Sequence, residues 1–184
     1  AILGEKGSRG NFGMSAKDLA SRFTKERDEG CPLQKRLGEY TMKKTDLTIE
    51  MVRRAIRHGV RFRYLLADSW FACASVVKFV VSRHIGCDYL GMIKIGEDSR
   101  TKYRFERKDV NAPSIIKTLK KRKEVRYSRK LKCWYISTDV VFADTHVRLF
   151  FIRRSKRGPW SGLLTTDLDL FQFFCNITER VHLY

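Results

Sequence analysis

With 184 residues, of which 43% are hydrophobic, the chain is long enough to bury the core of one ordinary domain. Its 38 Lys and Arg outnumber its 20 Asp and Glu, so the formal net charge is +18 at pH 7. This excess predicts a polyanionic partner: nucleic acid is the first candidate, because its phosphates repeat at short intervals, and an anionic membrane surface is the alternative. The apolar runs are short and exclude a membrane-spanning helix, which needs about 20 apolar residues.

The five cysteines are far apart and form no Cys-x-x-Cys pair. Their odd number and spacing predict reduced thiols and no structural zinc site. We therefore expect a cytoplasmic protein, associated with the nucleoid through its polyanionic partner. The chain opens on Ala1 without a basic leader, which predicts that an upstream part of the protein precedes it.

In chain order, residues 1–44 are basic and weakly periodic, and we expect a peripheral segment with one short helix at about 15–27. The pattern sharpens from Asp46 onward, where Val52 and Ile56 fall on one helical face. Asp46 or Thr48 is placed to cap this helix, and Gly59 is placed to end it. The sequence therefore predicts an amphipathic helix between these residues.

The next segment, 60–67, alternates apolar and basic residues and then becomes an unbroken apolar run. This pattern predicts a strand that enters the interior of a sheet, with Asp68 at its carboxyl end. A second helix is expected over 72–83 and a second strand over 89–95. The alternation of helix and strand predicts an α/β layer with a parallel strand pair and a right-handed crossover.

After Gly96 the sequence becomes mainly β, with strands expected at 103–105, 132–142, 146–152 and 160–166. Residues 117–132 hold nine cations and one acid, Glu124. Such a density of like charge is repulsive unless a polyanion neutralises it, so DNA-backbone binding is favoured over an ordinary solvated surface. The expected DNA-binding residues are Lys117, Lys120, Lys121, Arg122, Lys123, Arg126, Arg129, Lys130 and Lys132.

Asp68 is the best catalytic candidate. Polar groups at the carboxyl ends of strands in open α/β sheets border the ligand crevice, and a carboxylate there can hold a divalent metal. The alternative is that Asp68 caps the helix that follows it, and position alone favours this alternative.

Several blocks of the sequence, taken in order, bear on that choice: GEKGSRGNFGMS (4–15), LADSWF (66–71), YLGMIK (89–94), SRKLK (128–132), LFFIRR (149–154) and GLLTTD (162–167). With these blocks the chain resembles the transposases of bacterial insertion sequences that carry a DDE catalytic triad. The resemblance covers most of the chain and favours the catalytic role of Asp68, because this residue matches the second carboxylate of the triad.

The resemblance implies an α/β, RNase H-like core, a mixed sheet with flanking helices, interrupted by a β-rich insertion. It divides the chain into a basic peripheral segment (1–44), part of the core (45–96), a basic β-rich insertion (97–158) and a truncated or divergent return to the core (159–184). It also implies Mg²⁺ as cofactor, with Asp68 as one ligand, DNA as partner and a homodimer in the DNA complex. In this chemistry three carboxylates bind two Mg²⁺ ions, which assist in-line attack on a phosphodiester.

The chain also departs from the family. The first aspartate of the triad has no match and is expected to precede Ala1. The Tyr, Arg, Glu, Lys signature of the third carboxylate is absent from 171–180, and Glu179 lacks the Tyr and Arg that should precede it. We therefore expect strand cleavage and transfer only in the full-length protein, and none from this chain alone. The alternatives are a non-catalytic nucleic-acid-binding protein and an inert transposase remnant.

Overall fold

The computed structural model describes Ser21, Asp28 and residues 30–40, 42–82, 85–96 and 99–170. The chain divides into two compact units, Ala1–Arg54 and Ala55–Tyr184. The first unit contains α2 (Pro32–Tyr40), which was not predicted, and most of α3 (Lys44–Arg57). The helix expected over 15–27 lies outside the described residues except for Ser21, which is helical.

The helix α3 confirms the amphipathic helix predicted from Asp46. Val52 on its apolar face is buried, and the helix ends at Gly59, whose φ is +81°. The amides of Gly59 and Val60 donate to the carbonyls of Ile56 and Ala55 at 2.9 and 3.1 Å, which is a Schellman C-cap. The predicted N-cap was wrong, because α3 begins at Lys44 and places Asp46 and Thr48 inside the helix.

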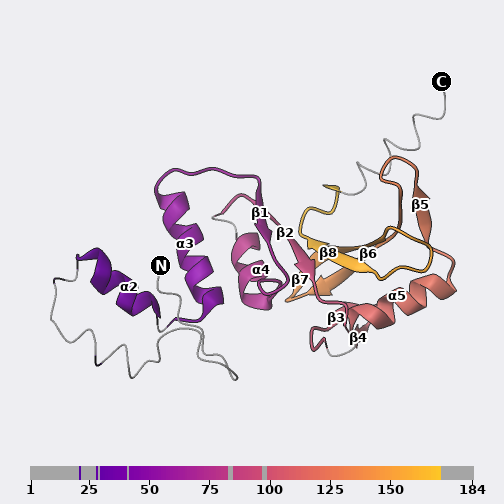
Figure 1. Cartoon of the computed structure of the whole chain (residues 1–184), viewed down its shortest axis with the longest axis horizontal. Helices are drawn as coiled ribbons and strands as arrows, with labels where there is room; N and C mark the ends of the chain where they lie inside the picture. Colours follow the sequence, from indigo (N-terminus) through magenta and orange to yellow (C-terminus); the bar gives the residue numbers. More distant parts are fainter. Residues whose placement is uncertain are drawn as a thin grey trace. The chain divides into compact units, whose positions relative to one another are not determined.

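The second unit contains one mixed sheet of eight strands in the order β1-β2-β8-β7-β6-β3-β4, with β5 paired to β6 (Figure 1). The pair β1–β2 is parallel, as predicted, and the other described pairs are antiparallel. The sheet therefore runs without a break between the expected core and the expected insertion. The strands are β1 (Tyr64–Ala67), β2 (Asp88–Ile93), β3 (Tyr103–Phe105), β4 (Lys108–Val110), β5 (Arg126–Ser128), β6 (Cys133–Phe142), β7 (Thr145–Arg153) and β8 (Ser161–Thr165).

Much of the core lies on one face of this sheet, where Tyr89, Leu149 and Leu164 are fully buried. Phe150 and Tyr135, which the register places on the other face, are buried as well. The helices α4 (Ala74–Val81) and α5 (Ala112–Lys121) contribute the buried side chains Val76, Val77, Val80, Ala112, Ile115, Ile116 and Leu119. Because the register places Gly91, Leu164 and Leu149 opposite one another, these strand residues share one face. The core is thus a sheet-on-helix layer, the α/β architecture that the sequence predicted.

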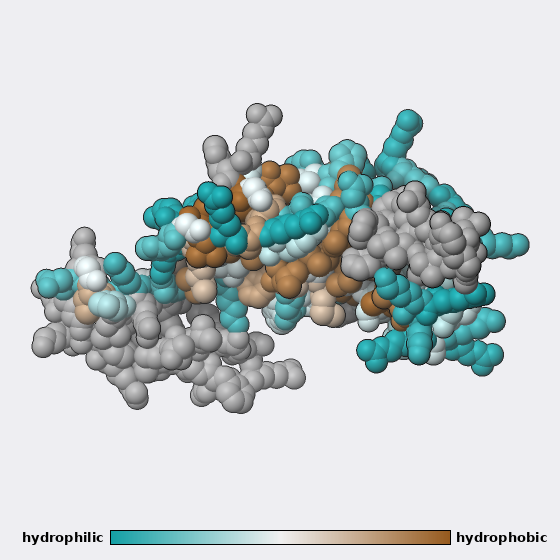
Figure 2. Space-filling model, turned by 90° about the horizontal axis from the view of Figure 1, so that it is seen from above, coloured by the Kyte–Doolittle hydropathy of each residue, from teal (hydrophilic) through white to brown (hydrophobic). Residues whose placement is uncertain are grey.

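The opposite face of the sheet is only partly covered. Leu66 on β1 and Met92 on β2 are 70% and 51% exposed. The register places Leu66 opposite Leu90 and Met92 opposite Leu163, so these four apolar side chains lie on the same face. We call this group the open face. Figure 2 shows hydrophobic side chains gathered in the middle of that view of the molecule.

The end of α5 provides a first test of the fold. Arg122 caps the helix, Lys123 follows with a φ of +61°, and the amide of Glu124 donates to the carbonyl of Leu119 at 3.1 Å. A left-handed residue at this position favours glycine, which has no Cβ. We expect Lys123→Gly to raise the free energy of unfolding by about 0.5–1 kcal/mol in urea titrations. Lys123→Ala removes the same charge but keeps a Cβ; equal stability of the two variants would contradict this explanation.

Candidate functional site

Asp68 follows β1 directly, at the carboxyl end of the strand, and is exposed. Its Oδ1 atom accepts a hydrogen bond from the Trp70 amide at 3.1 Å, and its carbonyl accepts one from the Phe71 amide at 3.0 Å. The hydroxyl of Ser69 and the amide of Trp70 hold the pKa of Asp68 below its usual value, so the carboxylate is ionised at neutral pH. Asp68 therefore presents a charged carboxylate to solvent from a tight turn.

The helix-cap alternative for Asp68 is wrong. The next helix, α4, begins at Ala74, and its N-cap residue is Cys73. Asp68 instead closes the turn between β1 and α4, where its side chain accepts the Trp70 amide. Helix capping therefore does not explain why an aspartate stands at position 68. The carboxylate keeps its remaining lone pairs for a ligand outside the turn.

A hollow of about 200 Å³ lies beside this turn, lined in part by Ser69, Trp70, Cys73 and Lys94. The Lys94 ammonium lies 4.3 Å from the centre of the Trp70 ring, and Trp70 is 72% exposed. The charge of Lys94 also contributes to the lowered pKa of Asp68. Sequence reasoning did not single out Trp70 or Lys94, although both belong to the blocks 66–71 and 89–94.

Asp68 belongs to no cluster of metal-binding side chains in the part of the chain that the structure describes. Within that part, no group of three or more His, Cys, Asp or Glu side chains could hold a metal ion. Two Mg²⁺ ions need several oxygen ligands in near-octahedral arrangements, which one carboxylate does not supply. The described residues therefore do not form the two-ion site by themselves, and Glu179 lies outside them.

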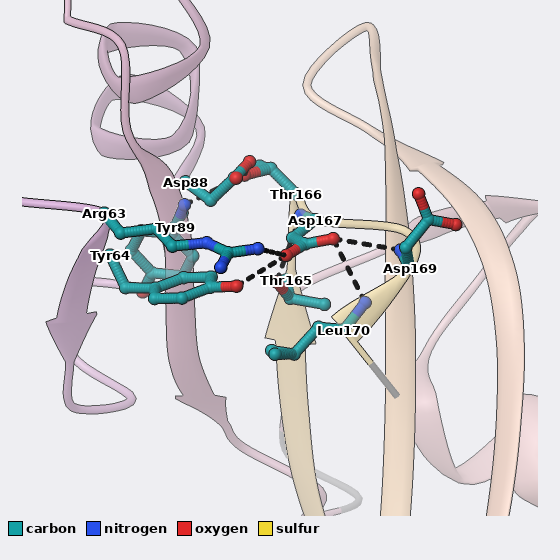
Figure 3. A network of polar contacts seen from close by, with 9 residues as sticks. All are labelled: Arg63, Tyr64, Asp88, Tyr89, Thr165, Thr166, Asp167, Asp169 and Leu170. Atoms are coloured by element: carbon teal, nitrogen blue, oxygen red, sulfur yellow. Dashed lines mark hydrogen bonds and ion pairs between the residues drawn. The ribbon is translucent and has the colours of Figure 1, made fainter. Parts of the chain in front are cut away.

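Asp167 lies beside Tyr64, the first residue of β1 (Figure 3), whereas Asp68 follows the last residue of that strand. Since β8 runs antiparallel to β2, the residues that follow β8 lie beside the start of β1. The Tyr64 hydroxyl donates to Asp167 Oδ2 at 2.6 Å, and Arg63 Nη2 lies 3.7 Å from the same oxygen. The four residues of β1 span about 13 Å, so Asp167 and Asp68 do not share one metal ion.

Asp167 instead organises the chain after β8. Its Oδ1 atom accepts hydrogen bonds from the amides of Asp169 and Leu170, both at 3.0 Å. The neighbouring Thr166 exchanges hydrogen bonds with the backbone of Tyr89, at 2.9 and 3.1 Å, and its hydroxyl donates to Asp88 at 2.8 Å. Figure 3 shows these contacts as one network that joins β1, β2 and the end of β8.

This network predicts a pH-dependent stability. The Tyr64 hydrogen bond is the main cause that lowers the pKa of Asp167, so the ionised form stabilises the folded state. We expect Tyr64→Phe to lower the free energy of unfolding by about 1 kcal/mol at neutral pH. Because the folded pKa is depressed, this contribution is present above the unfolded value of about 3.9 and is lost as the pH falls through the folded pKa.

The measurement is urea unfolding of wild type and Tyr64→Phe at a series of pH values. The difference between the two proteins should shrink as the pH falls below about 4. A difference that stays constant over that range would assign the effect of Tyr64 to packing alone. Tyr127→Phe is a matched control. It removes the same hydroxyl group from a tyrosine that is 49% exposed and lies on β5, far from Asp167 in the fold.

The nine predicted DNA-binding residues are all exposed. They follow the outer side and the end of α5, the strand β5, and the turn between β5 and β6. Arg122 forms an ion pair with Glu106, which also raises the pKa of the guanidinium. Lys120 and Lys121 lie in the last turn of α5, where cations also complement the helix dipole, so their position has a structural explanation as well.

Three of these cations, Lys117, Lys120 and Lys121, line a hollow of about 460 Å³ together with Ile95 and Trp160. Ile95 follows Lys94, which contacts Trp70 in the Asp68 turn. The lysines of α5 and the Asp68 turn therefore flank the same end of β2. The structure thus brings together two features that are far apart in the sequence.

Trp134 and Trp160 are half-buried. The Tyr127 and Trp134 ring centres lie 5.0 Å apart, and the Arg153 guanidinium lies 4.5 Å from the centre of the Trp160 ring. Both tryptophans therefore pack against neighbours on the sheet.

Among the described residues, no helix has the length and apolar content that crossing a membrane requires. Comparison of the chain with protein-family models, with curated proteins and with solved structures finds no match in any of the three.

Proposed function

We propose that the chain is a DNA-binding part of a DDE-type transposase with an RNase H-like core. The observation that carries the proposal is the arrangement after β2, where Ile95 lines the hollow of the exposed α5 lysines and the preceding Lys94 lies against Trp70 and acts on the ionised Asp68. A strand whose phosphates contact these lysines would pass close to a carboxylate at a strand end. Metal-assisted phosphodiester chemistry needs such a carboxylate together with further oxygen ligands, which would have to come from outside the described residues.

The lysines support DNA as the ligand. Lys117 lies about one helical turn from both Lys120 and Lys121, at spacings of three and four residues. Like charges at this spacing destabilise a helix unless a polyanion neutralises them. Phosphates of a duplex supply negative charge at a spacing short enough to contact several of these cations, and the release of counterions favours the complex.

Asp68 is proposed to supply one of the carboxylates for Mg²⁺ in the full-length transposase. Because the described residues offer no group of three or more metal-binding side chains, the chain alone is expected to bind DNA without cutting it. A non-catalytic nucleic-acid-binding protein would share the lysines and would need Asp68 only to close its turn. The role of Asp68 therefore separates the two functions.

The test has two parts. The purified chain is titrated with a labelled duplex at several salt concentrations, and log K should fall with log salt by about 0.9 for each phosphate contacted. No binding at low salt would overturn the proposal. In a longer protein that contains this chain and cuts DNA, Asp68→Asn should abolish Mg²⁺-dependent cleavage and leave duplex affinity unchanged; a variant that still cuts would leave only the DNA-binding function.

A further inference from the structure

Five neighbouring strands of the second unit end or begin at the same end of the sheet. The sheet places β1, β2, β8, β7 and β6 side by side in that order. Because β1 and β2 are parallel and the next three pairs are antiparallel, the ends of β1, β2 and β7 lie beside the starts of β8 and β6. The register agrees, since Ile93 pairs with Gly162 and Trp134 pairs with Arg153. We call this the Asp68 end of the sheet, because Asp68 directly follows β1.

Exposed cations recur along the Asp68 end from strand to strand. Lys94 directly follows β2, and the turn before β6 contains Lys130 and Lys132. Between them in the strand order, Trp160 directly precedes β8 and lines the hollow that the three lysines of α5 also line. The stretch 125–138, which includes the turn before β6, contains no Asp or Glu. Positive charge is therefore available at several successive strands of this end.

The dimensions of the Asp68 end match a stretch of duplex DNA. Neighbouring strands lie about 4.8 Å apart, so the path from β1 through β2, β8 and β7 to β6 spans about 19 Å. Successive phosphates of one DNA strand lie about 3.4 Å apart along the helix axis, so this span corresponds to about six base pairs. Several phosphates of one duplex can therefore meet cations at separate strands, and each contact releases counterions, which favours the complex.

We propose that one DNA duplex lies along the Asp68 end, from the turn before β6, past the lysines of α5, to Lys94. The inference rests on the proposed function and extends it, because it gives the path of the DNA and adds Lys94 as a contact residue.

Lys94 brings this path to Asp68. Its ammonium lies 4.3 Å from the centre of the Trp70 ring, and the Trp70 amide donates to Asp68 Oδ1 at 3.1 Å. A phosphate bound by Lys94 therefore lies near the carboxylate, and the lysine offsets the repulsion between these two negative charges. Lys94 is thus a positioning residue for the DNA backbone.

The salt dependence of binding to a duplex of about 16 base pairs, long enough to span the Asp68 end, tests the path. The double variant Lys130→Ser with Lys132→Ser should flatten the slope of log K against log salt by about 1.8, at about 0.9 per lost phosphate contact. Lys94→Ser should flatten the slope by about 0.9. The matched control is Arg57→Ser with Arg61→Ser, which removes two charges from exposed residues before β1, at the start of that strand rather than its end. This control should keep the wild-type slope.

The number of bound duplexes separates one path from two independent sites. With duplex in excess, native mass spectrometry should find no more than one duplex per chain. Two duplexes per chain would overturn the inference, and so would a Lys130 and Lys132 variant with the slope of the control. A wild-type slope for Lys94→Ser would also overturn it, because the path would then end short of Asp68.

Failure of the path and failure of the proposed function give different results. The absence of duplex binding at low salt would overturn both. Duplex binding that the variants of Lys94, Lys130 and Lys132 leave unchanged would overturn the path alone. Thermal unfolding of each variant checks that a flattened slope comes from the lost charge and not from a lost fold.

Discussion

Replacing Lys117, Lys120 and Lys121 together by Ser should weaken duplex DNA binding by roughly ten- to a hundred-fold near 0.1 M salt. These lysines line one hollow on α5 and are exposed, so each can reach a phosphate. The loss of three phosphate contacts should flatten the slope of log K against log salt by about 2.7, at about 0.9 per contact. Because phosphates carry no sequence information, the loss should be similar for duplexes of different sequence.

The measurement is fluorescence anisotropy with a labelled duplex over a series of salt concentrations. A second triple variant, Lys108→Ser, Arg154→Ser and Lys156→Ser, changes the net charge equally at exposed positions of other turns and strands. This control should lose less affinity and keep a steeper slope. Equal losses in both triple variants would mean that overall charge rather than the surface of α5 attracts DNA. Thermal unfolding of both variants checks that the fold is intact.

The sequence predicted β1, the end of α3 and the pairing of β1 with β2, because each depends on a pattern within one short stretch of the chain. The alternating and then apolar run before Asp68 predicted β1, and Gly59 predicted the end of α3. The parallel pairing of β1 with β2 followed from the helix between them. In each case one short stretch contains the information, because turn chemistry and periodicity act over a few residues.

The helix α5 was missed although its signals were present. Asn111 accepts the amide of Ser114 at 3.1 Å, Pro113 follows at the start of the helix, and the buried Ala112, Ile115 and Leu119 are spaced by three and four. The lysines that follow drew attention to charge, and the helical period was not applied. Strands β4 and β5 have only three residues each, so their formation depends on the strands beside them.

The surroundings of Asp68 could not be predicted for a different reason. The position of Asp68 at the end of β1 follows from local pattern, whereas the contact of Lys94 with Trp70 depends on the three-dimensional path of two loops. The distance between Asp68 and Asp167 depends on β8 pairing antiparallel with β2, two strands far apart in the sequence. No local signal specifies that register, so the opposite placement of the two aspartates emerged only from the structure.

Gly91→Ala is expected to lower the free energy of unfolding by about 1–3 kcal/mol. A Cβ at this position would lie 2.3 Å from the hydroxyl oxygen of Tyr89 and 2.6 Å from its Cζ atom. Tyr89 is fully buried, so its ring has no free space to enter, and burial raises the pKa of its hydroxyl. The backbone of Gly91 is also fixed, since it pairs with Ala67 on one side and Leu164 on the other.

Urea unfolding of three variants separates the clash from a general effect of the substitution. Gly38→Ala adds the same methyl group to α2, where no atom lies within 4 Å, and should be neutral or slightly stabilising. Tyr89→Phe removes the nearest atom of the clash, a hydroxyl without a hydrogen-bond partner in the described structure, and should cost little by itself. Combined with Tyr89→Phe, Gly91→Ala should therefore lose less stability than it does alone. If Gly91→Ala changes the free energy of unfolding by less than about 0.5 kcal/mol, the clash is absent and β2 can shift to make room for the methyl group. Lys94, which follows β2, would then be equally free to shift.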